Sequence, residues 1–159
     1  MNYKGHFGLS LFIISILSLI LKLKPTFFML FIIFLTTAIS TLPDIDLKLG
    51  IPHRTITHTM LFALIISGIL AGIFYYYSNI RNAIVIFIFV LIGITSHILG
   101  DLMNYQKMAP FWPFSSKKIS FRMFQGSNIY ANNFFFLLGI LAFFLYLLYS
   151  NDLLKNFGL

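Results

Sequence analysis

The side chains able to bind a metal or move a proton are few in this chain, and most of them gather in three short segments. The sequence contains four histidines, four acidic residues that are all aspartate, and no cysteine. Apart from His6 and Asp152, these residues stand in segments 43–46, 53–58 and 97–101. Imidazole and carboxylate ligands without thiolate suit a hard or borderline divalent metal such as zinc, manganese, iron or magnesium.

The segment 97–101 pairs an imidazole with a carboxylate at helical spacing. His97 and Asp101 are four residues apart, which places both side chains on one face of a helix, one above the other. Two ligands at this spacing can reach one metal ion. A single hydrogen bond between them at a helix end is the alternative. Gly93, Ser96 and Gly100 keep the helix surface small, so we expect a neighbouring backbone to approach it closely.

The segment 43–46 offers two further carboxylates after a proline. Asp44 and Asp46 are two residues apart in what we expect to be a polar, turn-rich loop over residues 43–52. On an extended loop they can point to one site or to opposite sides. An ordinary Asx turn after Pro43 is the alternative to metal binding.

The segment 53–58 combines His53 and His58 with an arginine. We expect Thr57 to cap the third apolar helix, which places His58 in its first turn. Because the helix dipole favours an acidic group at that position, a metal or a phosphate explains His58 better than local electrostatics. Arg54 could hold phosphate oxygens in a bidentate manner, or it could simply flank a membrane segment.

The composition indicates that lipid is the solvent for much of this chain. Of its 159 residues, 59% are hydrophobic and 9% are charged, whereas an ordinary soluble domain is about 45–50% apolar and about 25% charged. The net charge of +7 stands at the ends of the apolar segments, where it fits membrane topology and attraction to anionic headgroups. We do not expect nucleic-acid binding. The length fits one domain over residues 1–159.

Five apolar runs predict the elements that must position the polar segments. They cover residues 7–21, 27–42, 60–77, 83–99 and 134–149. Each is close to the length that crosses a bilayer as a helix, and Pro25 is placed to open the second of them. Because the runs lack the alternation of strands, the sequence predicts an all-α, polytopic membrane protein of about five transmembrane helices.

The alternation of these helices brings the polar segments to one membrane face. His6 precedes the first helix, Asp44 follows the second, His58 precedes the third, and Asp101 ends the fourth. We therefore predict a polar metal site at that face of an integral protein of the cell (inner) membrane. The same face carries most of the basic residues, so the positive-inside rule places it in the cytoplasm: Lys4, Lys48, Arg54, Lys107, Lys117, Lys118 and Arg122.

The joint pattern favours a metal-dependent hydrolase with roles for named residues. We expect metal ligands at His6, Asp44, Asp46, His58, His97 and Asp101. Because the candidates exceed the four ligands of one tetrahedral zinc, one or two divalent ions fit, with zinc first and manganese or magnesium as alternatives. The metal activates water, Asp46 or His53 acts as the catalytic base, and Arg54 stabilises phosphate charge.

The loop that follows the fourth helix suggests the substrate. Aromatic residues, prolines and lysines alternate over residues 108–118, which is typical of a segment at headgroup depth. Lys117 and Lys118 could steer an anionic headgroup, although an aromatic belt is the simpler role for Trp112. We therefore expect membrane lipids as partners and hydrolysis of a phosphoester or ester bond in a lipid-like or phosphorylated substrate, as in a phospholipase or phosphatase. A metal-ion or proton-coupled transporter and a scaffold with a structural metal are the alternatives.

These motifs in this order resemble the YdjM-like family of membrane proteins assigned as metal-dependent hydrolases. The resemblance rests on Leu-Pro-Asp-Ile-Asp at 42–46, His-Arg-x-x-Thr-His at 53–58, His-x-x-x-Asp at 97–101 and Trp-Pro-Phe at 112–114. It spans residues 6 to about 122 and implies membrane-bound hydrolysis without naming a substrate.

A weaker similarity is to zinc-dependent phospholipase C and related nucleases. It rests on Ser-His-Ile-Leu-Gly-Asp at 96–101 and on the order His6, Asp44, His58. Those enzymes take further histidine and glutamate ligands downstream, and nothing after Asp101 supplies them. The similarity therefore implies at most a reduced cluster of one or two metals.

Overall fold

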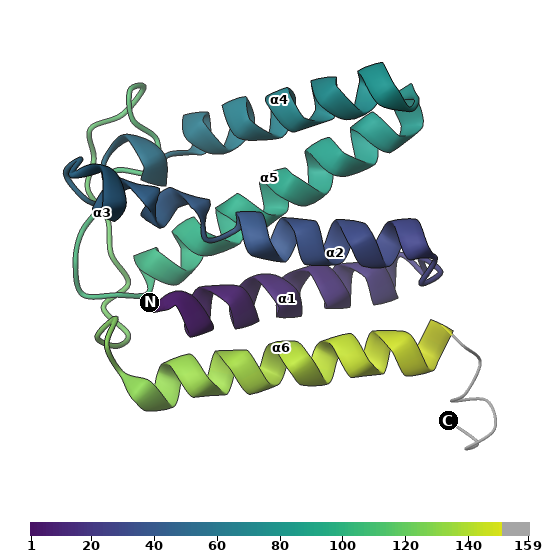
Figure 1. Ribbon diagram of the computed structural model, residues 1–159. Helices are drawn as coiled ribbons and strands as arrows, with labels where there is room; N and C mark the ends of the chain where they lie inside the picture. Colours follow the sequence, from purple (N-terminus) through teal and green to yellow (C-terminus); the bar gives the residue numbers. More distant parts are fainter. Residues whose placement is uncertain (151–159) are drawn as a thin grey trace.

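Five long helices run side by side in the computed structural model, which describes residues 1–150 (Figure 1). They are α1 (Tyr3–Ile20), α2 (Phe27–Ile39), α4 (Met60–Tyr77), α5 (Ile80–Leu102) and α6 (Ile129–Ser150). All five are long and apolar enough to cross a membrane once α2 is taken with the short helices that continue it to Leu49. No β-strand forms within residues 1–150. The prediction of an all-α protein with five membrane-spanning helices is confirmed.

Three short helices lie together at one end of the bundle, and two of them, η1 and α3, replace most of the predicted turn-rich loop. They are the 3-10 helices η1 (Leu42–Asp44) and η2 (Ile56–His58) and the α-helix α3 (Ile45–Leu49). Pro43 stands in the first turn of η1, where its fixed φ angle suits a helix start. Gly50 ends α3 in the left-handed conformation, with φ 67°, which glycine adopts without steric cost. The segment after Pro43 is therefore helical, and this fixes where each aspartate points.

The caps of the long helices differ from two sequence-based predictions. Pro25 does not open α2: the helix begins at Phe27, and the hydroxyl of Thr26 accepts a hydrogen bond from the Met29 amide at 3.3 Å. Thr57 does not cap α4 either. That role falls to Thr59, whose Oγ1 accepts from the Phe62 amide at 3.2 Å. Both prolines and threonines near a helix start are compatible with several cap positions, so the sequence leaves the choice open.

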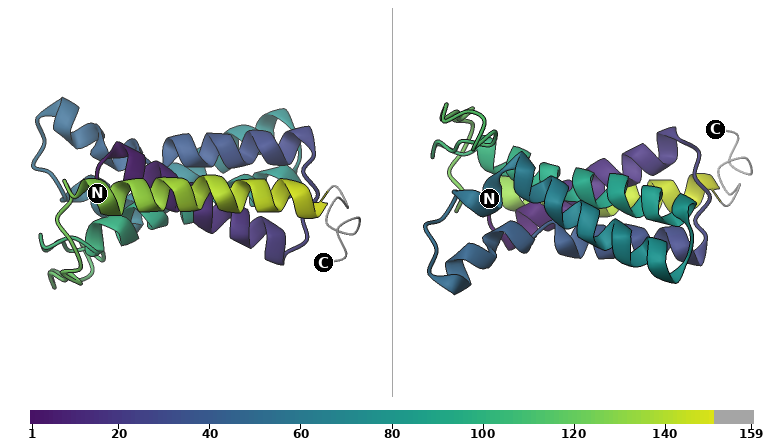
Figure 2. Two further views of the ribbon diagram at one scale, coloured as in Figure 1. Left: turned by 90° about the horizontal axis from the view of Figure 1, so that it is seen from below. Right: turned by 90° about the horizontal axis from the view of Figure 1, so that it is seen from above.

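Helix α5 occupies the middle of the bundle and contacts α1, α2 and α4, while α6 packs on the other side of α1 (Figures 1 and 2). The core between them contains Leu11, Ile14, Ile32, Ile33, Ile86, Val90 and Ile94. A glycine pair brings α1 and α6 together: a Cβ on Gly8 would collide with the backbone of Phe135, and one on Gly139 would collide with the backbone of Gly8. The small residues allow the close backbone approach that membrane helices use for packing.

The segment between α5 and α6 folds over the same end of the bundle as the short helices. Two isolated bridges order it, one between Asn104 and Phe124 and one between Met108 and Ile119. The amide of Met60, the first residue of α4, donates to the carbonyl of Pro110 at 2.8 Å. This segment therefore covers the end of the bundle that carries the polar motifs.

Candidate metal centre

The predicted convergence of the histidines and aspartates occurs. His6 lies in the first turns of α1, Asp44 at the end of η1, His58 at the end of η2, and His97 and Asp101 in the last turns of α5. Two groups of these side chains have potential ligand atoms within 4.8 Å of one another, and they share one carboxylate: Asp44, His53, His58 and Asp101 form the first, and His6, His97 and Asp101 the second.

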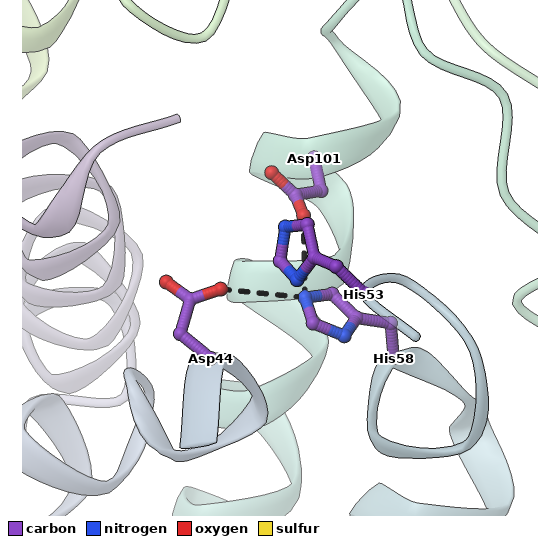
Figure 3. Close-up of side chains that lie close together, drawn as sticks. All are labelled: Asp44, His53, His58 and Asp101. Carbon is purple, nitrogen blue, oxygen red and sulfur yellow. Dashed lines mark ion pairs between the residues drawn. The ribbon is translucent and has the colours of Figure 1, made fainter. Parts of the chain in front are cut away.

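His58 stands at the centre of the first group. Its Nε2 atom lies 3.4 Å from Asp44 Oδ1 and 3.3 Å from Asp101 Oδ2, and Figure 3 shows both carboxylates approaching its ring from different elements. The Nε2 atom of His97 is 3.3 Å from His58 Nε2 and 3.4 Å from Asp44 Oδ1. Helices α5 and η1 and the segment before α4 thus direct ligand atoms to one point.

The second group adds the first helix to the cluster. The rings of His6 and His97 stack with their centroids 3.7 Å apart and their planes at 15°, and His6 Nε2 lies 3.3 Å from Asp101 Oδ1. Gly100 makes this possible, because a Cβ there would come within 3.1 Å of His6 Nδ1 and 2.8 Å of Met1 Sδ. Side chains approach Gly100, whereas the expected close approach of a neighbouring backbone occurs at Gly93, where a Cβ would come within 3.0 Å of the Thr36 carbonyl oxygen.

Asp101 joins the two groups and is almost completely buried. Its Oδ1 atom accepts hydrogen bonds from Arg54 Nη2 and Asn104 Nδ2, both at 3.0 Å, and from the amino group of Met1 at 2.8 Å. Its Oδ2 atom faces His58 and has no hydrogen-bond donor among the described residues. Oδ1 is thus fixed by donors, whereas Oδ2 is directed at the cluster. Asn104 was not identified from the sequence.

Asp46, predicted as a ligand or base, lies behind His58 and belongs to neither group. Its Oδ1 atom is 2.9 Å from His53 Nδ1, and its Oδ2 atom accepts from Thr57 Oγ1 at 2.9 Å and lies 3.3 Å from His58 Nδ1. Thr57 Oγ1 is also 3.0 Å from His58 Nδ1. A carboxylate that fixes the Nδ1 side of an imidazole turns the Nε2 side toward a metal. The structure thus gives Asp46 and Thr57 the geometry of supports for two imidazoles.

Arg54 bridges the supporting carboxylate and the shared one. Its amide donates to Asp46 Oδ2 at 3.2 Å, while its Nη2 atom donates to Asp101. The residue adopts a left-handed backbone conformation with φ 63°, which costs a non-glycine residue about 1–3 kcal/mol and is most common at functional sites. The contacts to both aspartates hold it there.

The electrostatics of the cluster favour a cation. Burial lowers the pKa of His58, but its close contacts with Asp101 and Asp44 and the charges of Asp101 and Asp46 outweigh burial, so the pKa is raised. Both ring nitrogens of His6 and the Nδ1 atom of His97 are buried without a hydrogen-bond partner among residues 1–150. The Nε2 atoms of His58 and His97 face each other at 3.3 Å. Together with the Asp101 oxygen that has no donor among the described residues, they form a nitrogen and oxygen donor set that fits a divalent metal.

Two pockets are each lined by a residue of the first group, His53 in one and Asp44 in the other. The first, which we call the entrance pocket, has a volume of about 470 Å3 and is lined by His53, Arg54, Thr55, Ile56, Lys107, Met108, Ala109, Trp112, Ser116 and Lys118. Lys117, predicted together with Lys118 to bind substrate, does not line it. The second has a volume of about 400 Å3 and is lined by Asp44 and Lys48 among mostly apolar residues.

Comparison with known proteins places the chain in one family. The chain matches the family described as YdjM inner membrane protein over residues 1–154, and it belongs to that family. No curated protein and no solved structure matches the chain.

Proposed function

We propose that this member of the YdjM inner membrane protein family is a metal-dependent hydrolase that uses water to cleave a phosphoester or ester bond of a lipid-like substrate. The observation that carries the proposal is the convergence of His58 Nε2, His97 Nε2 and Asp44 Oδ1 within 3.4 Å of one another, next to an Asp101 oxygen without a donor. Asp101 Oδ2, His97 Nδ1 and both ring nitrogens of His6 have no hydrogen-bond partner among the described residues, which is unusual for buried polar atoms.

The residues of the two groups would hold one or two divalent ions, with zinc first and manganese or magnesium as alternatives. Asp44, His58 and Asp101 would supply ligands for the first ion, and His6 and His97 would add theirs on the other side of the shared Asp101. A mixed nitrogen and oxygen set suits zinc and manganese better than magnesium, which prefers oxygen ligands alone.

A bound divalent cation would polarise the electrophilic phosphorus or carbonyl carbon and make a bound water more acidic. His53 is 30% exposed and faces the entrance pocket, so it can take the proton from the water, and Asp46 at its Nδ1 atom would stabilise the charged imidazole. The water oxygen bonds to phosphorus or carbon, and the ester oxygen leaves with a proton. Arg54 would stabilise the developing negative charge.

The surroundings of the site support a substrate that comes from the membrane. Phe111, Trp112 and Phe114 are exposed beside the entrance pocket, and aromatic residues are enriched where lipid meets water. The excess of lysine and arginine at this end of the bundle favours its location on the cytoplasmic side of the inner membrane.

Hydrolysis by the detergent-purified protein tests the proposal. We would supply short-chain phospholipids and nitrophenyl phosphoesters and compare wild type with His53→Gln and with Ser96→Ala. The Ser96 hydroxyl donates to the Gly93 carbonyl of its own helix. We expect hydrolysis by the wild type and by Ser96→Ala that is lost on chelation and returns with zinc or manganese. His53→Gln should keep the metal but lose most of the turnover. Turnover that is insensitive to chelation, or no turnover on any substrate with metal bound, would contradict the proposal.

A further inference from the structure

The entrance pocket is lined by both basic and apolar side chains. Arg54, Lys107 and Lys118 supply the charge, and none of the described residues that line the pocket is acidic. Neither lysine forms an ion pair with a residue of the described part of the chain. The pocket thus has two uncompensated cations in addition to the arginine. An anion that enters it gains charge-assisted hydrogen bonds, which are stronger than neutral ones.

Arg54 lines this pocket and has donors that no described residue uses. Its side chain is only 10% exposed, and its Nε and Nη1 atoms are buried without a hydrogen-bond partner among residues 1–150. Leaving buried donors of a charged group unpaired is costly, so acceptor oxygens that reach these atoms would stabilise the arginine. Because Nη2 of the same guanidinium contacts Asp101, an anion bound to Arg54 lies next to the metal cluster.

The apolar residues that line the pocket suit a hydrocarbon tail attached to that anion. Ile56 is 55% exposed and Trp112 is 42% exposed, and with Met108 both line the pocket. Exposed apolar side chains in the lining of a pocket offer a surface that a free phosphate ion cannot use. The ligand that fits both the basic and the apolar lining residues has an anionic head and an apolar tail.

We infer that the substrate is a phosphomonoester carried on an apolar tail, rather than a phosphodiester. A phosphomonoester bears a charge of about −1.5 to −2 at pH 7 because its second pKa is about 6, whereas a phosphodiester bears a single charge. Lys107 and Lys118, which form no ion pair among the described residues, lie beside Arg54 and match the higher charge of the phosphomonoester. This inference rests on the proposed hydrolysis for its reaction: water supplies the oxygen that bonds to phosphorus, the bond from phosphorus to the tail oxygen breaks, and that oxygen leaves as an alcohol.

The test measures binding without turnover, in the presence of a chelator. Isothermal titration of the full chain in detergent would compare dihexanoyl phosphatidate, dihexanoyl phosphatidylglycerol and inorganic phosphate, for wild type, Lys118→Gln and Lys117→Gln. The two lysines are neighbours and both are exposed, but only Lys118 lines the pocket. The pair therefore separates the pocket from the general basic character of the loop.

We expect phosphatidate to bind about fivefold or more tightly than either other ligand, and Lys118→Gln to weaken it about fivefold, as for one charge-assisted contact. Lys117→Gln should stay within about twofold of wild type, the level of an exposed charge. Equal affinity for the monoester and the diester, equal affinity for inorganic phosphate, or equal effects of the two variants would overturn the inference. Because no metal is present, a failure of the hydrolase proposal leaves this result unchanged.

Discussion

Helices α4 and α5 are neighbours with similar apolar composition but very different surroundings. Only Ser78 and Asn79 separate them in the chain, and they pack against each other along their length. In the most apolar stretch of α5, 56% of the residues are buried, against 11% in α4. The central helix carries His97 and Asp101, whereas α4 contacts the site through the segment that precedes it. We conclude that the residues of α5 are constrained by packing and by the histidine and aspartate of the site, whereas those of α4 are constrained mainly by the need to be apolar.

The largest expected effect comes from the shared carboxylate on α5. Asp101→Asn keeps the size of the side chain but removes its charge, and loss of a residue that supports a ligand already weakens metal binding about 10- to 100-fold. We therefore expect metal affinity to fall by more than about 100-fold. Competition with a metal-sensitive dye measures it. Ser96→Ala on the same helix should stay within about twofold of wild type, and equal loss in both variants would show a folding effect instead.

A larger side chain should be tolerated in place of a glycine of α4 but not in place of a glycine of α5. A Cβ on Gly93 of α5 would come within 2.5 Å of Thr36 Cγ2 and 3.0 Å of its carbonyl oxygen, whereas nothing lies within 4 Å of a Cβ on Gly72 of α4. We expect Gly93→Leu to destabilise the protein by about 2–3 kcal/mol, as overpacking does. Gly72→Leu should be nearly neutral. Thermal unfolding in detergent compares the two variants, and similar losses of stability would contradict the conclusion that α4 is constrained less by packing than α5.

A smaller effect is expected in the segment that links α4 to the site. Thr57 Oγ1 contacts both Asp46 and His58, whereas Thr55 Oγ1 donates to the carbonyl of Pro52. Thr57→Val removes the support of an imidazole, which we expect to weaken metal binding about 10-fold. Thr55→Val is the matched control and should leave it unchanged. A neutral Thr57→Val would show that Asp46 alone positions His58.

The smallest effect is a pH dependence from His58. The raised pKa means that protonated His58 stabilises the metal-free protein below the usual imidazole pKa, and this contribution is lost as the pH rises through the raised value. Metal requires the neutral imidazole. We therefore expect metal affinity to rise with pH and to level off only above pH 6.5, by at most about tenfold per pH unit for one proton. Affinity that is constant between pH 6 and 8 would contradict metal binding through His58.

The hydropathy of the five runs was sufficient to predict the long helices. Because successive helices cross the bilayer in opposite directions, it also predicted that their polar ends converge. The pairing of His97 and Asp101 could also be predicted, because it depends only on their spacing of four residues in a helix. The orientation of Asp46, the cap at Thr59 and the difference between Lys117 and Lys118 could not be predicted. Each depends on the path of a loop or short helix, and in these segments one residue of displacement changes which way a side chain points.

The central claim is that the histidines and aspartates hold a metal, and elemental analysis of the detergent-purified wild type tests it most directly. Measured beside His97→Ala and Ser96→Ala, the wild type and Ser96→Ala should contain one or two zinc or manganese ions per chain, and His97→Ala should lose most of them while it remains folded. Wild-type protein that stays free of metal after supplementation with both ions would contradict the account.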